Sequence, residues 1–492
     1  MSDRRSTPHA AGDDDPTPPR GVPASGGSPR SSRGLGRPRR GRDDWSEDDD
    51  WDEPNYFVRR ALVVAVVVAA IAGAAIVVGQ FLGGDDEAGP SSAAAAEWNT
   101  LVVLTADEIE LVDRNSTDVV DTFDADASLL DAQSLVTGKV LVTSTDEGRI
   151  GQLDLADGSV RRARTGPDET LRISRDHPAI AVSGPDGGGD VTIIDTRDRS
   201  TLSVADVAGL DDPLIFATQV LVNPTGTHVA MPVPNAFQSV IIDLEAETSE
   251  ALAGRVIALD DERVVTEQPA GGESELEFYD VTGERLGSVD VTSPQASLLR
   301  PDGTMLLVSV DGAVLTASAD GSVDDVGTLT DPDAVPIEIT DGIAVADGDR
   351  LLAIGGRRVF VLDRDGDQLG VAEGSLTTAA RSGARCATVG TGSNAASTML
   401  DLETGAVVAE TEQGLAGATS YDGCTASFIG NTAQLIADGE LLEVDADAIA
   451  AVAPDGGAYV ALDGRDAEYA EIDGDGSVEI GGRDAVIHFG QR

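Results

Sequence analysis

Cysteine and aromatic residues are scarce in this sequence of 492 residues, which has two Cys and only 3% Phe, Trp and Tyr. So few cysteines exclude a small disulfide-rich scaffold, because such a scaffold needs several bridges in place of a large core. Basic residues are also in deficit, with 34 Lys and Arg against 87 Asp and Glu and a formal net charge of −53. A negative field of this size argues against a nucleic-acid-binding protein, since it repels phosphates.

Signatures of catalysis are equally sparse. The sequence has no His-Glu-x-x-His metal helix, no Gly-x-Ser-x-Gly nucleophile elbow and no phosphate-binding Walker loop. Only three histidines, His177, His228 and His488, follow residue 84, and their spacing indicates no cluster. We therefore predict no catalytic and no cofactor-binding residues.

The first 60 residues differ from the rest in composition. They are rich in Pro, Gly, Ser and Arg, with six arginines between Arg30 and Arg42, and then carry an acidic run from Asp43 to Glu53. They hold little that is apolar to bury, so the entropy cost of ordering them exceeds the gain. We predict a disordered tail over residues 1–60.

Residues 61–82 read ALVVAVVVAAIAGAAIVVGQFL, with Gln80 as the one polar side chain. A helix of this length spans about 33 Å, enough to cross a bilayer core. Two arginines precede the run and three acidic residues follow it, so the positive-inside rule places the N-terminus in the cytoplasm. We predict a transmembrane helix over 61–83, a linker over 84–97 and an exported domain over 98–492. The alternative is a cleaved signal peptide, whose apolar region is normally shorter and closer to the N-terminus.

A short pattern recurs through residues 98–492: three or four apolar or β-branched residues, an Asp, and a turn of Gly, Asp, Thr or Ser. The clear copies place their Asp at Asp113, Asp154, Asp195, Asp243, Asp280, Asp363, Asp401 and Asp473, and weaker copies near Ser318 and Ala437 keep an Asp-Gly turn. Ten copies at a mean spacing of about 40 residues each indicate a hairpin, since Gly and Asp tolerate the positive φ of tight turns.

A second hairpin often precedes the first, marked by turns such as Asn223–Gly226, Pro301–Gly303 and Pro454–Gly456. Two hairpins per unit make four strands, which is the blade of a β-propeller. We predict an all-β fold with a single propeller. Tandem β-sandwiches are the alternative, but their units are about 100 residues long. Because propellers usually have about four to eight blades, we expect about eight, within a range of seven to ten. Residues 485–489 would close the ring by adding a strand beside residues 101–104.

The hairpins at Asp154–Val160 and Asp401–Val407 resemble those of quinoprotein-like and YVTN/WD40-like bacterial propellers. The resemblance covers roughly residues 98–492 and implies the propeller fold. Quinoprotein repeats usually have a Trp a few residues after the Gly, and the copies here have none; Trp98 is the only Trp after residue 60. This departure argues against the quinone-binding enzymes that the resemblance would otherwise imply.

Three alternating carboxylates, Asp363, Asp365 and Asp367, are the candidate metal ligands, for Ca²⁺. The loop lacks the Gly at position six and the Glu at position twelve of an EF-type site, so a solvated hairpin turn is the favoured interpretation. Cys386 and Cys424, 38 residues apart in successive repeats, are expected to form a disulfide outside the membrane, with two buried thiols as the alternative.

These features predict a single-pass bacterial membrane protein that displays an acidic propeller as a binding or scaffold module. The expected partners are the membrane itself and a protein of the cell envelope. The rival function is an extracytoplasmic enzyme, either a hydrolase or a quinoprotein-like oxidoreductase.

Overall fold

The computed structural model describes residues 98–491 except 106–107, 125–132, 146–147, 165–168, 271–272, 334–336, 346–347, 377–382, 391–395, 430–431, 465, 475 and 483–484. Every described residue belongs to one compact unit, Glu87–Arg492. The predicted tail, transmembrane helix and linker therefore lie outside the described residues. Among the residues that are described, no helix is long and apolar enough to cross a membrane.

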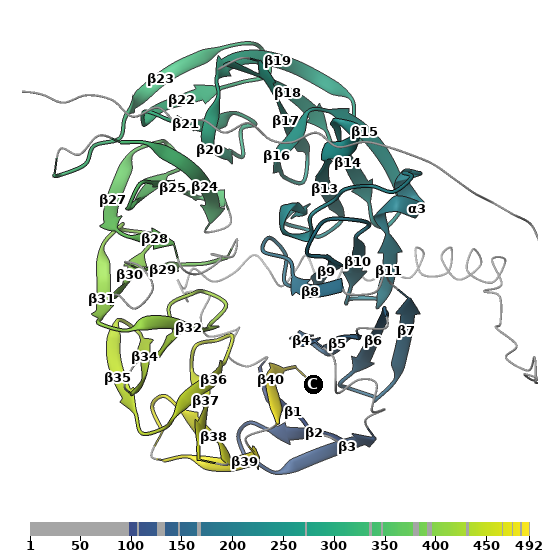
Figure 1. Ribbon diagram of the computed structural model, residues 1–492, viewed down its shortest axis with the longest axis vertical. Coiled ribbons are helices and arrows are strands. Elements are labelled where there is room, and N and C mark those ends of the chain that lie inside the picture. Colours follow the sequence, from purple (N-terminus) through teal and green to yellow (C-terminus); the bar gives the residue numbers. More distant parts are fainter. Residues whose placement is uncertain are drawn as a thin grey trace, which may run out of the picture. The chain divides into compact units, whose positions relative to one another are not determined.

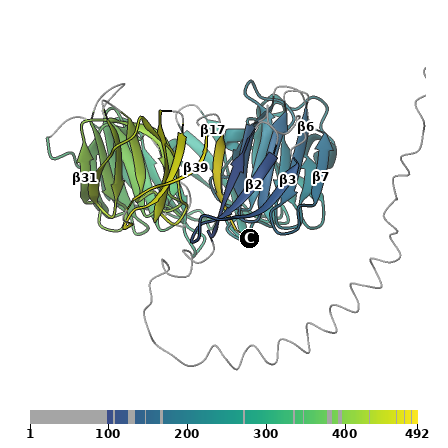
Figure 2. The same cartoon turned by 90° about the horizontal axis from the view of Figure 1, so that it is seen from below.

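In this described part, forty strands form ten four-stranded antiparallel sheets. The sheets follow one another around a ring as the blades of a propeller (Figure 1). Seen from the side, the strands run between the two faces of the ring (Figure 2). We number the blades 1 to 10 along the chain and give the strands of each from the axis outward.

Blade 1 contains β40 (Val486–Gly490), β1 (Thr100–Leu104), β2 (Glu108–Asp113) and β3 (Val119–Asp124); blade 2 contains β4 (Gln133–Thr137), β5 (Val140–Thr145), β6 (Arg149–Asp154) and β7 (Val160–Arg164). Blade 3 contains β8 (Glu169–Ile173), β9 (Ile180–Pro185), β10 (Thr192–Asp195) and β11 (Ser200–Ser203); blade 4 contains β12 (Leu221–Val222), β13 (His228–Val233), β14 (Gln238–Asp243) and β15 (Thr248–Ala253). Blade 5 contains β16 (Arg255–Leu259), β17 (Arg263–Ala270), β18 (Glu273–Asp280) and β19 (Arg285–Thr292).

Blade 6 contains β20 (Pro294–Leu299), β21 (Met305–Ser309), β22 (Ala313–Ala317) and β23 (Val323–Thr328); blade 7 contains β24 (Ile339–Val345), β25 (Arg350–Gly355), β26 (Arg358–Asp363) and β27 (Gln368–Glu373). Blade 8 contains β28 (Ser375–Leu376), β29 (Cys386–Gly390), β30 (Ser397–Asp401) and β31 (Val407–Thr411); blade 9 contains β32 (Gly414–Thr419), β33 (Ala426–Ile429), β34 (Ala433–Ala437) and β35 (Glu440–Val444). Blade 10 contains β36 (Ala448–Val452), β37 (Ala458–Asp463), β38 (Asp466–Glu471) and β39 (Val478–Gly482). The described helices are short: α3 (Val204–Ala208) and the 3-10 helices η2 (Ala217–Gln219) and η3 (Pro234–Ala236).

Apolar runs in the middle strands explain why the blades stack. The second strand of blade 6, β21, reads MLLVS and is buried along its whole length, whereas the outermost strand β23 reads VDDVGT and is almost entirely exposed. A strand that is buried on both faces needs apolar residues at successive positions, not at alternate ones. Neighbouring blades supply the cover, since one buried cluster joins Leu306 and Val308 of blade 6 to Leu351 and Phe360 of blade 7.

The recurring Asp lies at the turn between the third and fourth strands. In blade 5 the Asp280 carboxylate accepts the backbone N–H groups of Thr282 and Glu284, both at 2.9 Å. The hydroxyl of Thr282 also donates to this carboxylate and lowers the pKa of Asp280. The same capture of the backbone by an Asp side chain occurs at Asp113, Asp154, Asp195, Asp243, Asp363 and Asp401. The repeat that the sequence displays is therefore a turn-forming device.

The expected number of eight blades is wrong, although ten lies within the predicted range. Each of the ten sequence copies marks a separate blade, including the two without the Asp. Near Ala437, Asp438 and Gly439 both have positive φ, 48° and 77°, and join β34 to β35 without the Asp carboxylate. In blade 10 the third strand ends at Glu471, two residues before the Asp473 of the pattern. The expectation of eight followed the usual size of propellers, and the literal count of the repeats was the better guide.

Ring closure follows the predicted pairing of the two distant strands. Strand β40 pairs antiparallel with β1, from Thr100 opposite Gly490 to Leu104 opposite Val486. Blade 1 therefore takes its innermost strand from the far end of the described chain and its other three strands from the beginning. This arrangement hides the edge of β1, which would otherwise be open to pairing with another chain.

Arg114, which follows β2, joins blade 1 to blade 10, the last blade of the ring. Its Nε donates to Glu471 at 2.9 Å, and one of its terminal nitrogens forms an ion pair with Asp455. The guanidinium also donates to the backbone oxygen of Trp98 and to the hydroxyl of Tyr469. The side chains of Arg114 and Asp455 are only 10% and 4% exposed, so their charges depend on each other for solvation.

We predict that Arg114→Met lowers the free energy of unfolding by about 3 kcal/mol, because it leaves Asp455 buried without its partner. Urea unfolding and the melting temperature measure the effect. Arg364→Met is the matched control, since Arg364 and Asp349 form an exposed pair, and it should cost less than about 1 kcal/mol. Equal effects of the two substitutions would contradict a role for Arg114 in closing the ring.

Candidate functional site: the innermost strands and the turns

The wall of innermost strands is nearly free of charge, unlike the chain as a whole. Its ten strands contain four charged side chains, Glu169, Arg172, Arg255 and Asp341, which sum to zero. The ten outermost strands carry eleven Asp or Glu and four Arg. Among the described strands, those nearest the axis therefore carry no net charge, whereas the outermost strands are negative.

Most of the charges on the innermost strands already have protein partners. Arg255 on β16 forms an ion pair with Glu267 on β17 at 2.7 Å, and Arg172 on β8 pairs with Asp186 at 3.1 Å. Glu169 accepts the hydroxyl of Ser183 at 2.7 Å. These contacts stabilise the innermost strands. Each of the three charged side chains has its own partner, and the three do not point toward one shared site.

Blade 5 contains two buried carboxylates, Glu267 and Glu277, that no sequence motif marks. The other oxygen of Glu267 accepts the hydroxyl of Ser274 at 2.7 Å. Glu277 on β18 accepts the hydroxyl of Tyr279 at 2.6 Å and pairs with Arg285 at 2.8 Å. Burial and the hydrogen bond to Glu277 raise the pKa of Tyr279 to about 12, so the hydroxyl remains a donor. The signal in the sequence was the acidic residue alternating with apolar ones along β18.

His488 and Ser134 meet where the innermost strands of blades 1 and 2 adjoin. The Nε2 atom of His488 on β40 lies 2.9 Å from the hydroxyl oxygen of Ser134 on β4. Burial lowers the pKa of His488 to about 4, so the imidazole is neutral at physiological pH. A general base works best with a pKa near the operating pH, so this pair is poorly suited to activating the hydroxyl. It holds two blades together.

The His488 contact predicts that stability falls as the pH drops from about 6.5 to about 4. In this window the unfolded chain binds a proton that the folded protein excludes, so acid favours unfolding. The loss attributable to this residue is about 3 kcal/mol at the acid end. Unfolding by urea across the window measures it, and His488→Gln should flatten that part of the profile. An unchanged profile in the variant would contradict the assignment.

The candidate metal ligands lie at the turn between β26 and β27, where Asp363 accepts hydrogen bonds from the backbone of the turn. One oxygen of Asp363 accepts the backbone N–H groups of Asp365 and Asp367, both at 2.9 Å. This is the turn geometry found in the other blades. Within the described residues, no group of three or more His, Cys, Asp or Glu side chains is placed to hold a metal ion.

Cys386 and Cys424 are joined by a disulfide between blades 8 and 9, with their Cα atoms 4.9 Å apart. Cys386 begins β29, and Cys424 lies two residues before β33, so the two occupy similar places in successive blades. The backbone reinforces this junction, since the N–H groups of Arg385 and Cys386 both donate to the carbonyl of Asp422, at 2.8 and 3.0 Å.

Replacing both cysteines by serine should lower the free energy of unfolding by about 4 kcal/mol, the loop entropy expected for a bridge of this span. The comparison is urea unfolding of the double variant and the parent protein under non-reducing conditions. Adding a reductant to the parent should reproduce the loss and leave the double variant unchanged. A reductant that affects both proteins alike would show that the loss has another origin.

Comparison with known proteins found similarity only to solved structures. No protein-family model matches the chain, and no curated protein matches it. A solved eukaryotic initiation factor has a TM-score of 0.44 and 11% identity, covering 70% of this chain and 96% of its own. The dihydro-heme d1 dehydrogenase NirN, solved in complex with DHE, has a TM-score of 0.38 and 14% identity over 67% of this chain and 75% of its own. Apo AztD from Citrobacter koseri has a TM-score of 0.33 and 12% identity over 70% and 93%.

Proposed function

We propose that this protein is a single-pass membrane protein that displays its acidic propeller outside the cell as a binding or scaffold module. The observation that carries the binding role is the closed ring of ten blades. A closed ring holds its loops on a rigid frame, and loops on rigid frames are where proteins most often bind partners. The paired charges of the innermost strands support this role over chemistry at the axis.

The anchor rests on the sequence before the propeller. The apolar run at 61–82 has the length of a membrane span, and its flanking charges favour a cytoplasmic N-terminus. On this topology the arginine block of the tail would contact anionic lipid headgroups. The propeller would face partners of the cell envelope, and its charge would repel other acidic polymers.

The chain has one lysine, which makes the topology simple to test. Lys139 is exposed in the turn between β4 and β5, and the remaining basic side chains are arginine or histidine. We predict that a membrane-impermeant amine-reactive ester labels intact cells at Lys139, because the propeller is outside and the N-terminal amine is inside.

Lys139→Arg is the control and should reduce labelling of intact cells to background, while lysed cells still label at the N-terminus. Labelling of Lys139 only after lysis would overturn the proposed orientation. Release of the propeller into the medium without residues 61–82 would favour the cleaved signal peptide over the anchor.

A further inference from the structure

Phe237 is the most exposed large apolar side chain in the described part of the protein. It is 90% exposed, whereas the other exposed large hydrophobic residues are Val, Leu and Ile side chains between 38% and 54%. Phe278, Phe360, Phe428 and Phe489 are buried in the cores of their blades. In a chain with so few aromatics, one that faces water in full is available for contact with a partner.

The backbone of Phe237 has an unusual conformation. Phe237 ends η3 with φ 55° and ψ 37°, the left-handed conformation that a bulky residue seldom adopts. Its N–H donates to the carbonyl of Pro234 at 3.2 Å. Such a conformation costs energy and persists only where the surrounding structure imposes it.

Asn235 fixes this turn to a second loop. Its side-chain oxygen accepts the N–H of Leu214 at 3.0 Å, and its amide donates to the carbonyl of Asp212 at 2.9 Å. The second loop is tied to blade 3 in turn, because Ile215 and Gly189 exchange two backbone hydrogen bonds of 3.0 Å. We call residues 204–215 and 234–237 together the platform.

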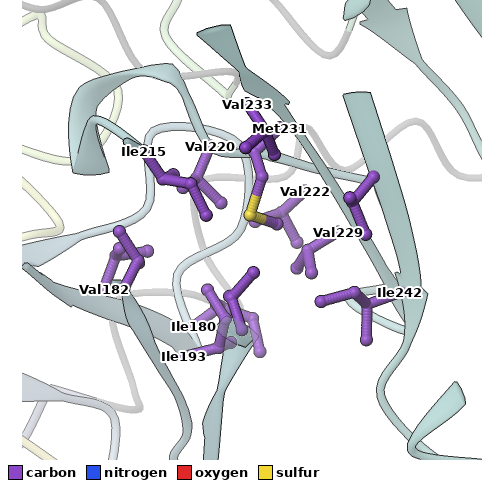
Figure 3. Close-up of a cluster of buried hydrophobic side chains, with 13 residues drawn as sticks. Ile180, Val182, Ile193, Ile215, Val220, Val222, Val229, Met231, Val233 and Ile242 are labelled. Carbon is purple, nitrogen blue, oxygen red and sulfur yellow. The ribbon is translucent and has the colours of Figure 1, made fainter. Parts of the chain in front are cut away.

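A continuous core lies beneath the platform. Figure 3 shows Ile215, which belongs to the platform, and Val233, which directly precedes its second segment. Both pack with side chains of blades 3 and 4 such as Val182 and Met231. Ile215, Val233 and Met231 are each at most 1% exposed. The Phe237 turn therefore rests on a well-packed base, which limits the conformational entropy that the platform itself loses when a partner binds.

The two segments of the platform carry charge of one sign, and the next arginine along the chain, Arg255, is paired with Glu267. Residues 200–254 contain no Lys or Arg, although the rest of the propeller has many arginines. Asp206, Asp211 and Asp212 on the platform are all exposed. An exposed aromatic ring on the same platform as exposed carboxylates suits a guanidinium, which can stack on a ring and pair with an acid.

We propose that the platform is the docking site for an arginine-containing segment of a partner protein, with Phe237 as its aromatic contact. This inference rests on the binding role proposed above and names the chemistry of the partner. It concerns the folded propeller alone, so the Lys139 labelling experiment and the experiment below can fail independently.

The test measures binding of a short dye-labelled peptide of alternating Arg and Gly to the full chain in detergent, by fluorescence anisotropy near physiological ionic strength. Phe237→Asn should raise Kd about tenfold, within the range for loss of a cation–π contact. The substitution leaves the net charge unchanged and places a residue that tolerates the left-handed conformation, so the melting temperature should not fall.

Charge is tested with a matched pair of double variants. Asp211→Asn with Asp212→Asn should raise Kd about fivefold, whereas Asp324→Asn with Asp325→Asn, which removes two exposed acids from β23 in blade 6, should change it less than about twofold. Leu286→Asn, at an exposed apolar position of blade 5, is the control for Phe237 and should leave Kd unchanged.

The proposal fails if Phe237→Asn binds the peptide as tightly as the parent, or if the two double variants weaken binding equally, since bulk charge would then explain the affinity. Equal affinity for a Lys-Gly peptide would exclude guanidinium recognition. Self-association of the parent that is lost in Phe237→Asn would assign the platform to a second copy of this chain instead.

Discussion

The mutual burial of neighbouring blades is the constraint on which this fold depends. The middle strands are apolar on both faces, so a single blade is soluble only between two others. A linear stack would leave two apolar faces at its ends, and closing the ring removes both. The pairing of β40 with β1 and the Arg114 contacts with blade 10 therefore stabilise more than blade 1, since they complete the cover of every sheet.

Local chemistry made much of the fold predictable. The Asp at the end of the third strand captures the backbone of its own turn, so it recurs wherever that turn does, and the recurrence reveals the blades. The glycine-containing turns between first and second strands are also local; the N–H of Gly303 reaches back to Arg300 and that of Gly456 to Ala453. The predicted number of blades was wrong because it followed the usual size of propellers and not the number of repeats in this sequence.

The bridge between Cys386 and Cys424 was predictable because the two residues recur one repeat apart, but most side-chain contacts across blades were not. The contact between Ser134 and His488 depends on ring closure. The hydrogen bond from Asn235 to Asp212 depends on how the connection between blades 3 and 4 packs against a turn of blade 4. Glu267 and Glu277 belong to one hairpin, yet their burial depends on the sheets packed against it. Such arrangements join residues whose distance in the sequence carries no periodic signal.

The order of the strands in blade 1 also has a consequence for biosynthesis. The first described strand, β1, pairs with β40, which is synthesised only after nine other blades have been translated. Contacts between residues so far apart form slowly, and the incomplete ring exposes a bare β1 edge meanwhile. Nascent chains are thus most vulnerable to proteases and aggregation during this interval.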